Sequence, residues 1–168
     1  ICSKKDPRGR ATVFDKLPPL KHGRWISIGR LDFNTTGLLL FTTDGDTANL
    51  LTHPSSMIER EYAVRVMGNV EPSMIKSMHE GVQIDNEIYR FTDIQYFGGD
   101  GLNRWYHVVV MTGRNREVRK LWESQGVKVS RLKRVRFGPI FMPSKLKRGQ
   151  HQELSQKEVE KLLKLVKS

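Results

Sequence analysis

One acidic residue, Asp32, is the first candidate for chemistry in this sequence. It lies in the stretch IGRLDFNTTGLLLFTTDG, from Ile28 to Gly45, between an arginine and the apolar run LLLFTT. Such a run is typical of a buried strand, so a carboxylate at its approach caps a turn, pairs with a cation or takes part in a reaction. Considered alone, Asp32 fits a turn or cap better than catalysis. The rest of the sequence must decide among these roles.

Familiar cofactor and nucleophile motifs are missing from the sequence. The five histidines fall at no metal-ligand spacing, and the only cysteine, Cys2, permits neither an internal disulfide nor a cysteine-based zinc site. There is no phosphate-binding loop, dinucleotide fingerprint or Gly-x-Ser-x-Gly elbow. The sequence therefore predicts no cofactor and no metal. The single cysteine also favours an intracellular, reducing compartment, which we take to be the cytoplasm.

Positive charge is concentrated late in the chain. The 168 residues carry a formal net charge of +11, and the segment from Thr112 to Gly149 holds twelve Lys and Arg against two Glu. Such a one-signed segment is expected of a protein that docks on nucleic-acid phosphates, whereas a solvated helix face usually mixes charges. No apolar run approaches the roughly 18 residues of a membrane span. We expect one domain that binds nucleic acid and no membrane.

The apolar pattern of the first half predicts alternating strands and helices. Strands are expected at 25–29 and 38–42, and Asp44 is a candidate cap for a helix running towards Leu51. In EREYAVRV the alternation puts Tyr62, Val64 and Val66 on one face of a half-buried strand. Residues 72–79 have the spacing of a short helix that begins at a proline. The first half is therefore mixed α and β.

The second half predicts a hairpin followed by two helices. IYRFTDIQYF and RWYHVVVM read as two strands joined by the turn residues GGDGLN. Residues 115–125 read as a helix with Val118, Leu121 and Trp122 inward and with Arg116, Arg119 and Lys120 off that core stripe. The final stretch, SQKEVEKLLKLVKS, has a capping box and an apolar stripe, which indicate a structural helix.

Three motifs carry a resemblance to a known family. GRLDFNTTGLLLFTTDG, EREYAVRV and TGRNREVRKLWESQGVKVSRLKRVRFG resemble, in family order, the motifs of RsuA/RluB-type bacterial ribosomal RNA pseudouridine synthases. GGDGLNRWY and GRNREVRKLWESQG are most similar to the RluB branch, which modifies large-subunit rRNA. The resemblance implies an α+β fold with a mixed, mainly antiparallel central sheet, flanking helices and a central active-site cleft. It covers nearly the whole chain, so 1–168 is expected to be one catalytic domain. The family's upstream S4-type RNA-binding domain is expected to be missing, and the first residue is not methionine.

The resemblance assigns roles to particular residues. Asp32 matches the aspartate on which these enzymes depend, Tyr62 the aromatic residue that stacks on the target uracil, and Arg119 the basic residue that pairs with the aspartate. Leu132 resembles the apolar residue that lines the base pocket. The residues expected to hold RNA are Arg30, Arg114, Arg116, Lys120, Arg131, Lys133 and Arg134.

The chemistry of pseudouridine formation suits these residue types. It needs an ionised carboxylate beside the sugar, and a neighbouring guanidinium keeps such a group charged in a dry pocket. It also needs an aromatic face that holds the detached uracil while allowing it to rotate, and the Tyr62 hydroxyl is a further candidate for removing the C5 proton. The resemblance implies a monomeric, cofactor-independent isomerase that acts on rRNA.

Other interpretations stay open from the sequence alone. Tyr62 and Leu132 are equally typical of core residues, and Arg119 has the spacing to pair with Glu123 on a helix surface. The chain could also be a sister enzyme that modifies small-subunit rRNA, or an RNA-binding or ribosome-assembly module without turnover. A binding module has no need of the acid in GRLD, which argues against the last alternative.

Overall fold

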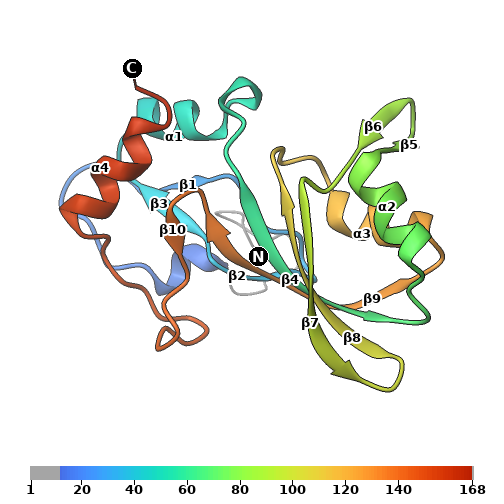
Figure 1. Cartoon of the computed structure of the whole chain (residues 1–168). Helices are drawn as coiled ribbons and strands as arrows, with labels where there is room; N and C mark the ends of the chain where they lie inside the picture. Colours follow the sequence, from blue (N-terminus) through green and yellow to red (C-terminus); the bar gives the residue numbers. More distant parts are fainter. Residues whose placement is uncertain (1–11, 168) are drawn as a thin grey trace.

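The computed structural model describes residues 12–167 and has an α+β architecture (Figure 1). The helices are α1 (Gly45–Thr52), α2 (Pro72–Glu80), α3 (Glu117–Ser124) and α4 (Gln156–Lys164), with 3₁₀ turns at Val13–Lys16 and Pro54–Ser56. The strands are β1 (Ile26–Ile28), β2 (Thr36–Gly37), β3 (Leu40–Thr42), β4 (Arg60–Met67), β5 (Val82–Ile84), β6 (Glu87–Tyr89), β7 (Asp93–Asp100), β8 (Asn103–Val110), β9 (Lys128–Phe137) and β10 (Ile140–Phe141). Cys2 lies outside the described residues.

The main sheet is mixed and mainly antiparallel, as expected. Its strands run in the order β10, β9, β4, β8, β7, and β2 adds a short parallel pair to β9. β1 pairs with β3, and β5 pairs with β6, in two separate antiparallel pairs. The register sets Val64 of β4 between Tyr106 of β8 and Leu132 of β9. Because side chains alternate along a strand, these three residues share one face of the sheet.

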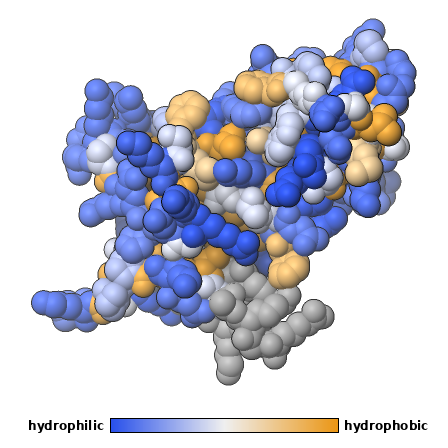
Figure 2. Space-filling model, turned by 90° about the horizontal axis from the view of Figure 1, so that it is seen from below, coloured by the Kyte–Doolittle hydropathy of each residue, from blue (hydrophilic) through white to orange (hydrophobic). Residues whose placement is uncertain are grey.

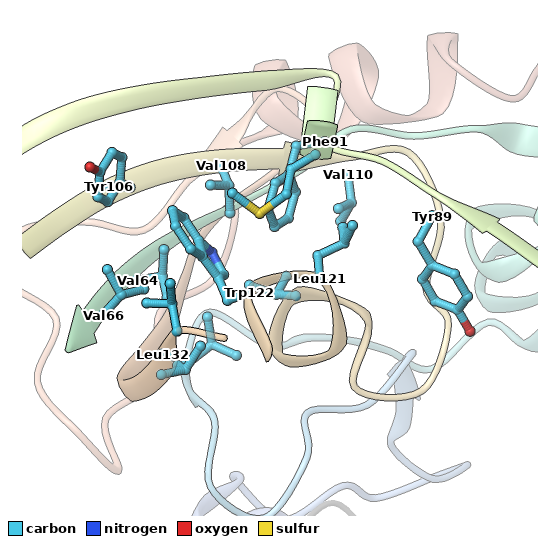
Figure 3. Close-up of a cluster of buried hydrophobic side chains, with 14 residues drawn as sticks. Val64, Val66, Tyr89, Phe91, Tyr106, Val108, Val110, Leu121, Trp122 and Leu132 are labelled. Atoms are coloured by element: carbon cyan, nitrogen blue, oxygen red, sulfur yellow. The ribbon is translucent and has the colours of Figure 1, made fainter. Parts of the chain in front are cut away.

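Two hydrophobic cores pack against the main sheet. The first joins β4, β8 and β9 to α2 and α3, and Trp122 and Phe91 are fully buried in it (Figure 3). The second joins β1, β3 and α1 to α4 through Leu51, Ile140 and Leu162. Figure 1 shows these two groups of helices on opposite sides, with β4 and β9 passing between them. The central strands therefore connect two packed halves.

Most of the expected elements are confirmed. Asp44 caps α1, accepting a hydrogen bond from the backbone N–H of Asp46, and Ser155 and Glu158 form the capping box of α4. The third helix begins at Glu117, two residues later than expected, because Arg116 takes the left-handed conformation at its N-cap with φ of 54°. That helix ends before Gly126, whose φ is 76°.

The predicted hairpin is correct in type but wrong in extent. IYRFTDIQYF is not one strand: its first residues belong to β6, which pairs with β5, and β7 begins only at Asp93. The second and third residues of GGDGLN are Gly99 and Asp100, which pair with β8, and the register shifts between Tyr96 and Gly99. The turn itself is confined to Gly101 and Leu102. A bulge of this kind absorbs residues that the sequence pattern assigns to a loop.

Gly37 brings the Asp32 region against the central sheet. It lies in β2 beside Arg134 of β9, with φ of 108°. A Cβ atom at this position would collide with the backbone of Arg134. Only glycine tolerates both the dihedral angle and the close approach. β2, absent from the sequence predictions, therefore fixes the chain between Asp32 and β3.

Candidate active site

A cavity of about 510 Å³ lies where the two halves of the molecule meet. Its walls come from the segment between β1 and β2, from the start of β4, from the loop before α3 and from the second half of β9. The residues expected to act on the base or sugar, Asp32, Tyr62 and Leu132, all line it. So do Arg30, Arg114, Arg116 and Arg134 from the predicted RNA-binding set. The fold thus gathers residues that are up to 104 positions apart in the sequence.

Asp32 belongs to a turn, and its side chain lines the cavity. Its backbone carbonyl accepts a hydrogen bond from the N–H of Thr35 at 2.9 Å, and the residue is half-buried. Asp32 therefore does take part in a turn, but through its backbone carbonyl and not through its side chain. The side chain carboxylate remains available for another role.

Arg119, which the helical spacing put off the core stripe, holds the Asp32 turn. It is 8% exposed, and its Nη2 donates a hydrogen bond to the carbonyl of Asn34 at 2.7 Å. Burial lowers the pKa of Arg119, while the negative charge of Asp32 acts in the opposite direction. Within residues 12–167 the two side chains make no ion pair shorter than 4.0 Å. The expected pairing of these groups stays a prediction, now with a contact that places Arg119 beside the same turn.

Tyr62 lies on β4 with its ring at the cavity, on the same face as Val64. Burial raises the pKa of its hydroxyl group, and the nearby charge of Arg134 only partly offsets this rise. A phenol with a raised pKa keeps its proton at neutral pH and is a poor base. The hydroxyl is therefore a weak candidate for removing the C5 proton, whereas the ring is well placed for stacking.

Arg134, expected to hold RNA, is buried in the cavity wall. It is 3% exposed, and its Nε donates a hydrogen bond to the carbonyl of Leu38 at 2.9 Å. Its guanidinium lies 5.6 Å from the centre of the Phe137 ring. The side chain therefore joins β9 to the segment after β2 and forms part of the cavity wall. Its expected contact with RNA stays a prediction, and the side chain also supports the cavity.

The other predicted RNA-binding residues fall on two faces. Arg30 and Arg116 are exposed at the cavity, and Lys120 lies 5.7 Å from the Tyr89 ring, away from the cavity lining. Arg131 and Lys133 are exposed on the face of β9 opposite to Leu132. Figure 2 shows the molecule from below, where hydrophilic residues cover most of the visible face. The basic segment is therefore not one continuous patch.

Two buried charged residues of the cavity were missed by the sequence reasoning. Arg60 is 8% exposed and donates from Nη1 to the carbonyls of Ile58 and Met111 at 2.7 and 3.3 Å. Glu117 is 7% exposed, and burial raises its pKa to about 7. Its Oε2 accepts a hydrogen bond from the hydroxyl of Thr112 at 2.5 Å. Glu117 could have been noticed as one of only two acids in the basic segment.

Within residues 12–167 no cluster of three or more His, Cys, Asp or Glu side chains is arranged to hold a metal ion. None of the helices in that range has the length and apolar character that crossing a membrane requires.

Comparison with known proteins identifies the family. The family described as RNA pseudouridylate synthase matches residues 1–124. The chain is 59% identical over 161 residues to the ribosomal large subunit pseudouridine synthase B of Pseudomonas aeruginosa, covering 95% of this chain and 42% of that protein. The protein of the same name from Escherichia coli K12 is 53% identical over 166 residues, with coverage of 99% and 57%. The chain thus spans about half the length of the curated relatives it matches.

Solved structures agree with this relationship. A crystal structure of a pseudouridylate synthase has a TM-score of 0.79 and 29% identity to this chain, covering 90% of it and 65% of the other chain. An H/ACA ribonucleoprotein bound to a substrate RNA containing 2′-deoxyuridine has a TM-score of 0.54 over 70% of this chain and 40% of the other. At 19% identity, that second likeness concerns the fold alone. The resemblance to the RluB branch and the expected fold are both confirmed, and the chain belongs to the RNA pseudouridylate synthase family.

Proposed function

We propose that this chain converts uridine to pseudouridine in large-subunit ribosomal RNA. The observation that carries the proposal is the cavity in which Asp32, Tyr62 and Leu132 meet, with Arg30, Arg114 and Arg116 also in its lining. The names of the relatives from Pseudomonas aeruginosa and Escherichia coli support large-subunit rRNA as the target. We further propose that the chain acts as a monomeric catalytic domain in the cytoplasm.

The reaction exchanges one bond for another within the nucleotide. The bond between N1 of uracil and C1′ of the sugar breaks, the uracil rotates, and C5 bonds to C1′. C5 then loses its proton and N1 gains one, so the reaction has no net redox change and consumes no second substrate. The residues must therefore supply charge stabilisation, a nucleophile or base, and a surface on which the uracil can turn.

Asp32 is the proposed nucleophile or base. Its carboxylate lines the cavity, and the buried guanidinium of Arg119 acts on it electrostatically. The hydrogen bond from Arg119 to the carbonyl of Asn34 also restrains the turn that carries Asp32. Arg119 therefore positions the acid and places a positive charge beside it.

Tyr62 and Leu132 form the proposed uracil site. Val64 and Leu132 are direct neighbours in the β4 and β9 register, and Tyr62 lies on the same face two residues earlier in β4. An aromatic face stacks on a base with roughly 1 to 3 kcal/mol and does not fix its in-plane orientation. An apolar side chain on the neighbouring strand limits the room for water. This pair would hold the detached uracil while permitting its rotation.

The target uridine must leave its stack to enter the cavity. Extrusion costs a few kcal/mol, which contacts to the surrounding RNA must offset. Arg30 and Arg116 are exposed at the cavity and can bind adjacent phosphates, while Arg131 and Lys133 offer a separate contact on the opposite sheet face. Phosphate contacts of this kind give affinity without reading base sequence.

Release of tritium from C5-labelled uridine tests the proposal directly. We expect this chain to release label from unmodified large-subunit rRNA and not from small-subunit rRNA. Asp32→Ala should abolish release while RNA binding persists, because Asp32 serves chemistry and Arg30 and Arg116 serve binding. If wild type and Asp32→Ala release label equally, the proposed role of Asp32 is wrong. Release from small-subunit rRNA alone would favour the sister enzyme, and binding without release would favour a non-catalytic module.

A further inference from the structure

Glu117 is a buried acid in the cavity that the proposed reaction does not use. Its hydrogen bond with Thr112 joins the first residue of α3 to the chain just after β8. The bond spans five residues and closes the segment between them into a ring. We name residues 112–116 the arginine loop. It forms one wall of the cavity and contributes Arg114 and Arg116 to the lining.

Several contacts hold the arginine loop and its flanking residues in place. Arg60 donates to the carbonyl of Met111, the residue just before the loop. At its side, Arg114 donates from Nη1 to the carbonyl of Ile88 at 2.7 Å and lies 4.5 Å from the centre of the Tyr89 ring. Glu117 closes the loop from the helix side. Arg116 is the exposed cation of the loop, and its left-handed backbone, with φ of 54°, needs such support.

We propose that Glu117 is a positioning residue whose buried carboxyl group closes the arginine loop and so holds Arg116 at the cavity, where its guanidinium binds a phosphate beside the target uridine. The proposal rests on the proposed function for the identity of the ligand. The role differs from catalysis, because Glu117 acts through the loop and Arg116 touches the RNA.

The protonation state of Glu117 should make RNA binding depend on pH. Its carboxyl group faces Arg60 and Tyr62 from β4 and Arg114 from the loop, and burial against these elements keeps its pKa at about 7. Both forms can accept the Thr112 hydrogen bond, but the ionised form adds a negative charge to a cavity that must receive phosphate. We therefore expect RNA to bind more tightly at pH 6 than at pH 8.

A double-mutant cycle with RNA binding as its readout tests the proposal. Dissociation constants for an unmodified large-subunit rRNA fragment would be measured for wild type, Glu117→Ala, Arg116→Ala and the double variant. We expect each single variant to weaken binding by about tenfold, the size of one charge-assisted hydrogen bond. If Glu117 acts through Arg116, the double variant should be no weaker than Arg116→Ala. Additive losses would overturn the proposal.

Further variants separate positioning from unfolding and from charge. Glu117→Gln keeps an acceptor for Thr112, so it should bind RNA within about threefold of wild type and lose the difference between pH 6 and pH 8. Glu80→Gln, on the exposed surface of α2, should behave as wild type in both respects. If Glu117→Ala does not fold, Thr112→Val removes the other partner of the bond. The proposal would be refuted if Thr112→Val and Glu117→Gln both bind RNA as tightly as wild type does and if Glu117→Gln keeps the wild-type pH profile.

Hydrogen exchange of the protein without RNA supplies a readout independent of turnover. Amides of residues 113–116 should exchange at least about tenfold faster in Glu117→Ala than in wild type, and at the wild-type rate in Glu80→Gln. Equal protection in Glu117→Ala would show that the loop does not depend on Glu117. If wild type binds rRNA and shows the expected cycle but releases no tritium, only the proposed isomerase function fails.

Discussion

The stability of the chain should depend on pH through Glu117. The carboxyl group has an ordinary pKa of 4.5 and a pKa of about 7 in the folded chain, because it is buried in the cavity wall. Below pH 4.5 the group is protonated in both folded and unfolded states and has no differential effect. As the pH rises towards 7, only the unfolded state releases the proton, so the unfolded state is favoured. The free energy of unfolding therefore falls as the pH rises from 4.5, and the loss is complete once the pH has passed through 7.

The size of this effect follows from the difference between the two pKa values. Each pKa unit corresponds to about 1.4 kcal/mol, so the difference amounts to about 3 kcal/mol between pH 4.5 and pH 8. Glu117→Gln removes the titrating group and keeps the shape. The free energy of unfolding of wild type minus that of Glu117→Gln should therefore fall by about 3 kcal/mol over this range.

Urea denaturation followed by tryptophan fluorescence can measure this difference. Trp122 of α3 is fully buried in the core, so its emission reports unfolding. Titrations at pH 4.5, 6, 7 and 8 would be compared among wild type, Glu117→Gln and the exposed control Glu80→Gln. Glu80→Gln should follow wild type. Parallel pH curves for wild type and Glu117→Gln would refute the reasoning, because they would mean that the folded state does not perturb the Glu117 carboxyl group.

Substitutions at Arg119, Tyr62 and Gly37 test the cavity further. Arg119→Met should lower the rate constant of tritium release by about 10- to 100-fold, because it removes a charged hydrogen bond worth about 1.5 to 3 kcal/mol. The control Lys120→Met should change only RNA affinity. If Arg119→Met and wild type have equal rate constants, Arg119 is merely structural. Tyr62→Phe should keep most turnover at saturating rRNA, whereas Tyr62→Leu should lose roughly 1 to 3 kcal/mol of base stacking. Equal losses of turnover in the two variants would argue against stacking. Gly37→Ala should lower the free energy of unfolding by roughly 2 kcal/mol or more in urea, because a Cβ atom would collide with Arg134, and an unchanged midpoint would contradict that close approach.

The local elements could largely be predicted from the sequence. Alternation in EREYAVRV and the capping residues Asp44 and Ser155 act over a few positions, and the structure confirms each of them. The motif resemblance likewise identified the family, because it depends on residue types in order and not on packing. The sequence predictions were wrong where the pairing partner of a strand decides its extent. The strand IYRFTDIQYF is divided because its first residues pair with β5 and its last with β8.

The burial and partners of charged residues were decided only by the tertiary structure. Arg119 and Arg134 both occur in a basic segment, and nothing in the composition of that segment separates them from exposed neighbours. They are buried because α3 and β9 pack against the segment between β1 and β3, which supplies the carbonyls of Asn34 and Leu38 as partners. Such contacts join residues 85 and 96 positions apart. The sequence by itself determined which residue types are present for chemistry, and the packing of two halves across β4 and β9 decided which of them line the cavity and which support it.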